Sequence, residues 1–270
     1  MALGVLNNIS AVYAENNLNQ TQASLTTTLQ QLSSGSRINS GADDPAGLSL
    51  ADGLGAASTA LNQSAMNADE GVDFLQVADG ALSQVTNMLN RAVTLATEAS
   101  NGVLNTSQDT AANSEYQNIL TEIGDIDTNT EYNGINVFST AANIFTSDGT
   151  LNQTNSATAL GSVVTAADLT GTDLTSAGDA TTALGKITTA IGAIASERGT
   201  AGAGINTLQD VSSVVSTEGT NTLSAENDVT ATDYGQAASN LSKYEVLMQT
   251  GISALAQANS TQQLVTKLLQ

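Results

Sequence analysis

The chain of 270 residues has no cysteine, no histidine and no tryptophan, and it has only one proline. Without cysteine, thiolate chemistry and cysteine-ligated metals are excluded, although the compartment stays open because large secreted proteins fold without disulfides. Without histidine, serine triads and histidine-based zinc hydrolases are excluded as well. A glycosidase that needs only two carboxylates is the enzyme class left open. We expect no enzyme and no cofactor.

Positive charge is also scarce, with six Lys and Arg against 26 Asp and Glu and a net charge of −20. Nucleic acids and anionic membranes both bind basic surfaces, so neither is an expected partner. No apolar run approaches the roughly 18 residues of a membrane span. No Lys or Arg precedes Arg37, and a cleavable signal peptide begins with a basic region. We therefore expect secretion, if it occurs, to use another route.

Aromatic residues make up only 3% of the chain, while 40% of it is hydrophobic. This composition suits contacts between long helices better than a thick globular core. Apolar periodicity predicts helices over residues 1–33, 45–99, 108–126, from Asp179 to a break near 218–224, and 236–270. The expected fold is mainly α, an elongated bundle of long helices with a small β-hairpin region in the middle of the chain.

The two end segments share a pattern of apolar residues at steps of three, four or seven, which is typical of helices that pack along one another. Charge is nearly absent from both, with Glu15 alone in residues 1–36 and Lys243, Glu245 and Lys267 alone after Gly235. We expect the two segments to pack together as a terminal pair. We also expect their outer faces, which carry little charge, to contact other copies of the pair. The predicted seam consists of Leu18, Leu25, Leu29, Leu32, Leu241, Tyr244, Met248, Leu255, Val265 and Leu269.

The middle of the chain changes to turn-forming sequence. Residues 132–138 alternate around Asn133-Gly134, and residues 143–151 alternate around Asp148-Gly149. Asn-Gly and Asp-Gly between alternating residues predict β-hairpins. From residue 152 to about 180 the composition shifts to Thr, Ser, Gly, Ala and Asp, for which we expect short strands and loops.

A connector with strong local signals follows the first helix. Residues 37–42 are expected to be extended, Asp44 to cap the next helix, and Pro45 to occupy its first position. The pair Asp43-Asp44 could also suggest a metal site, but helix capping is the favoured reading. Residues 125–129 begin like a calcium loop, yet Thr130 stands where the loop needs glycine. The sequence therefore predicts no metal site.

The segment Leu32-Ser33-Ser34-Gly35-Ser36-Arg37-Ile38-Asn39-Ser40-Gly41-Ala42-Asp43-Asp44-Pro45-Ala46-Gly47 resembles bacterial flagellin. Leu255-Ala256-Gln257-Ala258-Asn259 and the closing Leu268-Leu269-Gln270 resemble the C-terminus of the same family. The resemblance covers nearly the whole chain except about residues 143–179. It implies a minimal flagellin with an inner coiled-coil domain of residues 1–43 and 232–270. Residues 44–231 would form the core domain, with a β-hairpin insert at about 132–180.

The resemblance implies a structural subunit that polymerises with itself into the extracellular filament used for swimming. It implies export in unfolded form through the flagellar type III apparatus with a secretion chaperone, and contacts with the cap and junction proteins. The terminal segments would fold into the inner layer on assembly. Arg37, Asp43 and Asp44 would belong to the connector between the inner domain and the core domain.

Arg91, Leu95 and Glu115 match family positions that a vertebrate Toll-like receptor contacts, so they are candidates for receptor or subunit contacts. Two other functions stay open. A hook–filament junction protein shares the terminal plan but forms a short ring. A secreted adhesin or glycan-binding protein would use residues 143–179 as its working surface.

Overall fold

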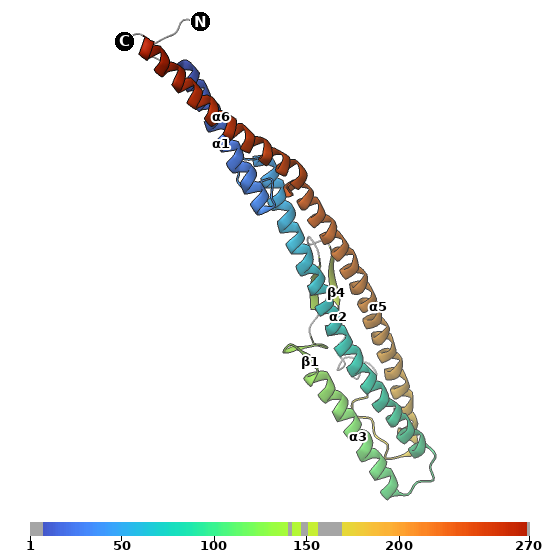
Figure 1. Ribbon diagram of the computed structural model, residues 1–270. Helices are drawn as coiled ribbons and strands as arrows, with labels where there is room; N and C mark the ends of the chain where they lie inside the picture. Colours follow the sequence, from blue (N-terminus) through green and yellow to red (C-terminus); the bar gives the residue numbers. More distant parts are fainter. Residues whose placement is uncertain (1–7, 140–141, 147–150, 156–168, 269–270) are drawn as a thin grey trace. The chain divides into compact units, whose positions relative to one another are not determined.

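The computed structural model describes residues 8–139, 142–146, 151–155 and 169–268. The helices are α1 (Ile9–Ser34), α2 (Pro45–Ser100), α3 (Thr106–Asn129), α5 (Ala177–Thr230) and α6 (Tyr234–Leu268), and the strands are β1 (Glu131–Tyr132), β2 (Ile135–Asn136), β3 (Ala142–Thr146) and β4 (Leu151–Asn155) (Figure 1). The predicted helical class with a small central β element is confirmed. None of the described helices is long and apolar enough to cross a membrane.

The chain divides into two compact units. The first comprises residues 1–56 and 221–270, and the second comprises residues 57–220. In the first unit α1 packs along α6 (Figure 1), which confirms the predicted terminal pair. The boundaries between the units fall within α2 and within α5. Each of these two helices therefore contributes residues to both units.

Local capping rules explain most helix ends. Helix α1 ends at Gly35, which has a φ of 73° and donates its N–H to the Gln31 carbonyl. Helix α2 begins after Asp44, whose carboxylate accepts the Gly47 N–H at 2.9 Å, as the sequence predicts. Helix α3 begins two residues earlier than expected, since Asn105 and Gln108 form a reciprocal capping box. These ends are therefore set by side chains next to them in the sequence.

Two predictions about α5 are wrong. Ser176, rather than Asp179, caps the helix, and its hydroxyl accepts the Asp179 N–H at 3.2 Å. The expected break at residues 218–224 does not occur, because the helix continues to Thr230. Gly219 is buried, and a Cβ added there would lie 3.6 Å from both Leu61 Cβ and Asn62 Oδ1 of α2, so interhelical packing outweighs the weak helix propensity of this stretch.

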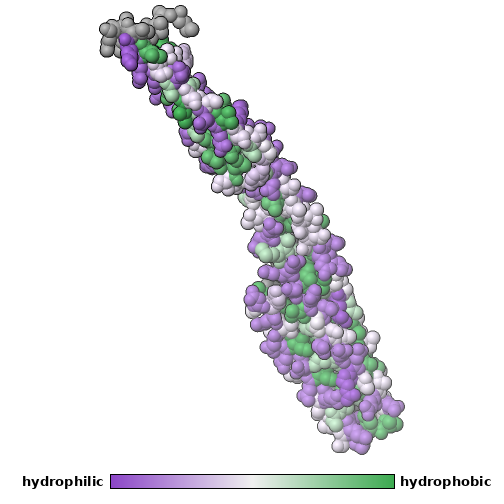
Figure 2. Space-filling view, in the orientation of Figure 1, coloured by the Kyte–Doolittle hydropathy of each residue, from purple (hydrophilic) through white to green (hydrophobic). Residues whose placement is uncertain are grey.

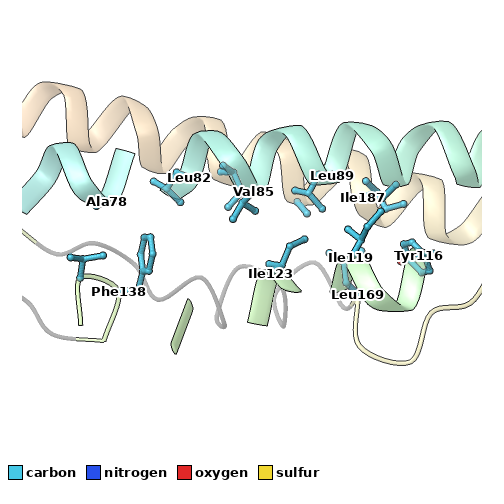
Figure 3. Packing of buried hydrophobic residues seen from close by; sticks show 14 of the residues in the cluster. Ala78, Leu82, Val85, Leu89, Tyr116, Ile119, Ile123, Phe138, Leu169 and Ile187 are labelled. Atoms are coloured by element: carbon cyan, nitrogen blue, oxygen red, sulfur yellow. The ribbon is translucent and has the colours of Figure 1, made fainter. Parts of the chain in front are cut away.

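The core of the second unit is a narrow apolar layer between three helices. Leu82, Val85 and Leu89 of α2 face a layer that is formed by Phe138 and by Ile119 and Ile123 of α3 (Figure 3). Further core side chains come from α5 and from the segment that precedes it; they include Ala183, Ile187, Ala190, Ile194, Leu208, Leu169 and Leu174. Many of the core residues are alanines, which fits the helix-to-helix contacts expected from the composition.

Polar side chains of α3 hold the segment that leads into α5. The buried Tyr116 hydroxyl lies 2.5 Å from the Thr172 hydroxyl, and Gln117 donates to the Thr172 carbonyl at 2.7 Å. Asn113 accepts the Leu174 N–H at 2.9 Å. Burial raises the pKa of Tyr116, so the ring stays neutral and keeps this hydrogen bond over the ordinary pH range.

Both predicted hairpins contain paired strands. In the first, Asn133 and Gly134 have φ values of 52° and 75° between β1 and β2, which is the turn that Asn-Gly favours. In the second, β3 pairs antiparallel with β4, with Thr146 opposite Leu151. Residues 147–150, including the predicted Asp148-Gly149 turn, lie outside the described residues, as do residues 156–168 of the expected loop region.

The second hairpin packs against α2 at a glycine. The side chain of Ile144 on β3 is buried against Gly71, and a Cβ at Gly71 would also lie 3.0 Å from Cδ1 of Leu208. Asn67 on the same helix donates to the Phe145 carbonyl at 3.0 Å. The hairpin is thus fixed to α2 by a close contact that only glycine allows.

This contact predicts opposite effects for two substitutions in α2. Gly71→Ala should lower the free energy of unfolding by about 1–3 kcal/mol through overpacking against Ile144 and Leu208. Gly80 has no atom within 4 Å of an added Cβ, so Gly80→Ala should raise it by about 1 kcal/mol through helix propensity. Urea unfolding followed by circular dichroism measures both. Equal effects of the two substitutions would contradict the glycine contact.

Candidate assembly surface

The contact between α1 and α6 is narrow. Leu25, Thr28 and Ala237 are each 6% exposed and are the buried residues in the described part of the pair. Gly251 makes room for Leu18, since a Cβ there would lie 3.3 Å from Cδ1 of Leu18. Such a thin seam stabilises two long helices only weakly.

The predicted seam residues divide into four groups by their exposure and by whether the structure describes them. Leu25 is buried, and Leu18, Leu32, Leu241, Tyr244, Met248 and Leu255 are half-buried. Leu29 is 49% exposed, because Thr28 takes the position between Leu25 and Leu32 that faces α6. The side chain of Val265 and the whole of Leu269 lie outside the described residues.

Large apolar side chains remain on the outside of the pair. On α1 these are Ile9, Val12, Tyr13 and Leu29, and on α6 they are Tyr234, Val246, Leu247, Ile252 and Leu264; all nine are between 43% and 68% exposed. Green, hydrophobic surface is visible along this pair in Figure 2. An apolar surface that persists on a folded unit marks a contact with another molecule.

The same pair carries almost no charge. Its four charged residues are Glu15 on α1 and Lys243, Glu245 and Lys267 on α6, so their charges cancel within a chain of net charge −20. An apolar surface with little charge loses less solvation free energy when it is covered. The acidic excess of the protein therefore lies outside the helix pair.

A groove of about 590 Å³ lies between α1 and α6. Its walls combine the polar side chains of Asn17, Thr21 and Thr250 with apolar surface from Tyr244 and Ala254. No acidic or basic side chain lines it. The groove belongs to the same uncharged surface as the exposed apolar residues.

The connector after α1 forms a joint with residues 229–232, where α5 ends. Ser36 forms an antiparallel bridge with Ala231. The Arg37 N–H donates to the Thr230 carbonyl at 2.7 Å, and the Thr232 N–H donates to the Gly35 carbonyl at 3.0 Å. The Arg37 guanidinium donates to the Val229 carbonyl at 2.8 Å, so a positive charge sits where the α5 dipole is negative.

The carboxylates of the connector's two aspartates accept hydrogen bonds from backbone N–H groups nearby in the chain. The Asp43 carboxylate accepts the N–H groups of Asn39 and Ser40 and the Ser40 hydroxyl at 2.8–3.0 Å. These bonds, first of all the one from the Asn39 N–H, lower the pKa of Asp43 below its ordinary value. Asp44 caps α2. Both carboxylates are thus occupied, and the described residues contain no cluster of three or more potential metal-binding side chains.

The three candidate contact residues on α2 and α3 do not share one surface. Arg91 and Glu115 form a two-pronged ion pair, with Nε to Oε1 at 2.7 Å and Nη2 to Oε2 at 3.0 Å. Arg91 lowers the pKa of Glu115 through this bond, and both side chains are about half exposed. Leu95 is only 3% exposed and belongs to the core, so it is not available as a surface contact in this conformation.

Two features of position 35 favour glycine over any other residue, and they predict the effect of a Gly35→Ala substitution. Its φ of 73° is unfavourable for other residues, and an added Cβ would lie 2.7 Å from the Tyr234 hydroxyl. Gly35→Ala should therefore cost about 1–2 kcal/mol from the backbone alone. We expect faster amide hydrogen exchange at the end of α1 and the start of α6, by about tenfold. Gly41→Ala, whose Cβ meets only an ordinary contact with Leu48, is the control and should leave this exchange unchanged.

The lowered pKa of Asp43 predicts sensitivity of the joint to acid. Its ionised form stabilises the fold above the ordinary pKa of 3.8, and this contribution is lost as the pH falls through the lowered value. Asp43→Asn should lower the urea midpoint at pH 7 and show a smaller further loss at about pH 3 than the unchanged protein. Asp52→Asn, at an exposed position of the same unit, should retain the full acid loss. Parallel pH profiles for all three proteins would count against this role.

Comparison with known proteins identifies the family. The model of the bacterial flagellin N-terminal helical region matches residues 5–143, and that of the C-terminal helical region matches residues 184–269. The flagellin of Listeria monocytogenes is 29% identical over 97% of this chain and 98% of its own length. Flagellin FlaB2 of Treponema pallidum is 28% identical over the same shares of the two chains.

A solved structure supports the same assignment. The crystal structure of Bacillus cereus flagellin is similar with a TM-score of 0.51 and 30% identity, covering 60% of this chain and 94% of that chain. The two family matches leave only residues 144–183 between them, so no large outer domain is inserted there. Flagellins are structural, non-enzymatic proteins that polymerise with themselves into the extracellular filament used for swimming. The chain belongs to the bacterial flagellin family, in a minimal form without a large outer domain.

Proposed function

We propose that this flagellin enters the filament through its terminal helix pair, whose uncovered faces contact neighbouring copies. The observation that carries the proposal is the combination of nine exposed large apolar side chains, among the described residues, with only four charged residues on α1 and α6. Other copies of the same chain are the molecules that would cover these faces, because the chain belongs to a family whose members polymerise with themselves. Fully burying each large apolar side chain would contribute about 1.5–3 kcal/mol.

Because the seam between α1 and α6 is thin, we expect assembly also to stabilise the folded state of this helix pair. Among the residues of α1 and α6 whose side chains the structure describes, only Leu25, Thr28 and Ala237 are buried, and a long helix pair with so little burial is marginally stable by itself. Contacts that exist only in the polymer stabilise the folded pair by mass action. The terminal segments should therefore be less ordered in the free subunit than in the filament.

The joint gives the terminal pair a fixed connection to the rest of its unit. Arg37 and the Ser36–Ala231 bridge tie the connector to the end of α5, and Asp43 closes the connector on itself. We assign to Arg37, Asp43 and Asp44 the transmission of contacts from the terminal pair to α2 and α5. Without these hydrogen bonds, the terminal pair would be connected to α2 and α5 only through two segments of backbone that no contact holds in place.

Further partners follow from this route of assembly. The cap and junction proteins would meet the same terminal faces before a neighbouring flagellin covers them. The export apparatus and a secretion chaperone would handle the chain before it folds. The absence of cysteine supports passage in unfolded form, because no disulfide has to be reduced first. These partners place the working protein outside the cell, in the flagellum.

For a Toll-like receptor, only part of the expected surface is available. Arg91 and Glu115 are exposed but bind each other, and Leu95 is buried. A receptor would have to compete with the ion pair for both side chains. A contact between subunits that accepts the intact ion pair is the better supported role.

A pair of matched substitutions tests the proposal. Val246 on α6 and Val214 on α5 are both 62% exposed, but only Val246 belongs to the terminal pair. Val246→Asp would bury a charge on assembly, which costs several kcal/mol, so it should abolish growth of filaments from seeds. Val214→Asp should permit growth. Electron microscopy of seeded, purified protein records the lengths.

The same experiment separates the rival functions. Continuous growth of the unchanged protein is expected of a filament subunit, whereas short rings would identify a junction protein. An adhesin would form neither and would bind glycans through residues 143–179. Failure of the unchanged protein to elongate seeds, or normal growth of Val246→Asp, would refute assembly through the terminal pair.

A further inference from the structure

Two asparagine–glycine pairs of the second unit lie in different surroundings. Asn101-Gly102 follows the last residue of α2, and Asn133-Gly134 forms the turn between β1 and β2. All four residues are exposed, and the sequence contains this dipeptide at no other place. The same reactive dipeptide thus occurs once at a helix end and once inside a hairpin, so the two sites show how the fold controls its chemistry.

An asparagine that precedes glycine reacts with the backbone of its own chain. The glycine nitrogen attacks Cγ of the asparagine, the bond from Cγ to Nδ2 breaks, and the side-chain nitrogen leaves as ammonia with the proton of the glycine N–H. The product is a five-membered succinimide ring. Water then adds to one of the two ring carbonyl carbons and breaks its bond to the ring nitrogen, which leaves aspartate or isoaspartate. Glycine favours the attack because it has no Cβ beside the attacking nitrogen.

The folded structure controls this reaction through the backbone. Ring closure requires the asparagine side chain and the next backbone nitrogen to rotate toward each other, mainly about the asparagine ψ angle. A segment that hydrogen bonds and packing hold on both sides resists the rotation, so it reacts only when it opens locally. The rate at each site therefore depends on how much free energy its opening costs.

The hairpin around Asn133 is held firmly. Its φ of 52° belongs to the tight turn that joins two paired strands. Before the turn, Tyr132 packs edge-to-face against Phe74 of α2, with ring centres 6.2 Å apart. After the turn, Asn136 donates to two carbonyls at the end of α3 at 2.7 and 3.0 Å, and Val137 is fully buried. Rotation at Asn133 requires the loss of such contacts on both sides.

The end of α2 is held more loosely. The Asn101 N–H donates to the Glu98 carbonyl at 3.3 Å, which is a long hydrogen bond. Gly102 has a φ of 67°, similar to that of Gly35 at the end of α1. The Gly35 N–H donates back into its helix, whereas no such bond from the Gly102 N–H occurs in the described part of the chain. Val103 is 76% exposed, so few contacts have to break before Asn101 rotates.

We propose that Asn101 is a site of spontaneous deamidation in the folded protein, and that the hairpin protects Asn133 from the same reaction. The proposal concerns the second unit and does not depend on contacts between copies. Conversion places a new negative charge at the C-terminal end of α2, where the helix dipole is already negative. The modified helix should therefore fray further at this end. Because the converted fraction increases with time, it records the age of the subunit.

Peptide mapping by mass spectrometry tests the inference on the full-length protein. The protein is incubated at neutral and at mildly alkaline pH, both folded and in concentrated guanidinium chloride. The gain in mass on replacement of NH₂ by OH is followed at both positions. The denatured chain gives the ratio of the two rates that the sequence alone sets. Relative to that ratio, we expect Asn101 to convert about tenfold or more faster than Asn133 in the folded protein. Both rates should rise with pH, because the attack requires loss of the glycine N–H proton.

Two substitutions separate the causes. Asn101→Gln should prevent conversion at position 101, because the longer side chain closes a larger ring less readily. Asn136→Ala removes hydrogen bonds that hold the hairpin, so it should raise the rate at Asn133 and leave that at Asn101 unchanged. Circular dichroism checks that both variants keep their helices. If Asn136→Ala unfolds, the comparison between the folded and the denatured unchanged protein still decides.

Two results would overturn the inference. In the first, Asn133 keeps pace with Asn101 in the folded protein once the rates are divided by those of the denatured chain. In the second, Asn101 converts no faster than Asn105, which is exposed but not followed by glycine. Neither result would affect assembly through the terminal pair.

Discussion

The thin seam between α1 and α6 is the constraint on which the rest of the account depends. Leu25, Thr28 and Ala237 are the buried residues in its described part, and Gly251 makes room for Leu18. A seam this narrow leaves large apolar side chains uncovered on both helices, and these would be a liability in a protein that stays monomeric. In a member of a polymerising family the same side chains become the contact surface, and folding of the pair becomes coupled to assembly.

Charge is distributed in accordance with this coupling. The acids of the chain are concentrated outside the helix pair, where they keep the subunit soluble and are screened by salt. On the pair itself the charges cancel, so covering it requires little desolvation of unpaired groups. The joint between Arg37 and the end of α5 links this uncharged pair to the helices that carry the acidic surface. Assembly and solubility are thus assigned to different parts of one chain.

Features set by neighbouring residues or by apolar periodicity could be predicted from the sequence, whereas contacts between particular distant residues could not. The Asp44 cap and the turn at Asn133-Gly134 follow local rules, and the pairing of the end helices follows from their matching apolar periodicity. The unbroken course of α5 depends on the packing of Gly219 against α2, which no local pattern reveals. The bridge between Ser36 and Ala231 joins segments from the two ends of the chain. The exposure of Leu29 and the burial of Leu95 were missed because a spacing gives a helical face only approximately.

Hydroxyl-radical footprinting of the free subunit and of the filament tests the central claim most directly. The account predicts that labelling of Tyr13 and Leu264, which are 68% and 60% exposed, falls strongly when the subunit assembles. Met66 on α2, which is 52% exposed and lies outside the terminal pair, serves as the internal reference. Equal labelling of Tyr13 and Leu264 in the free and the assembled state would contradict assembly through the faces of α1 and α6.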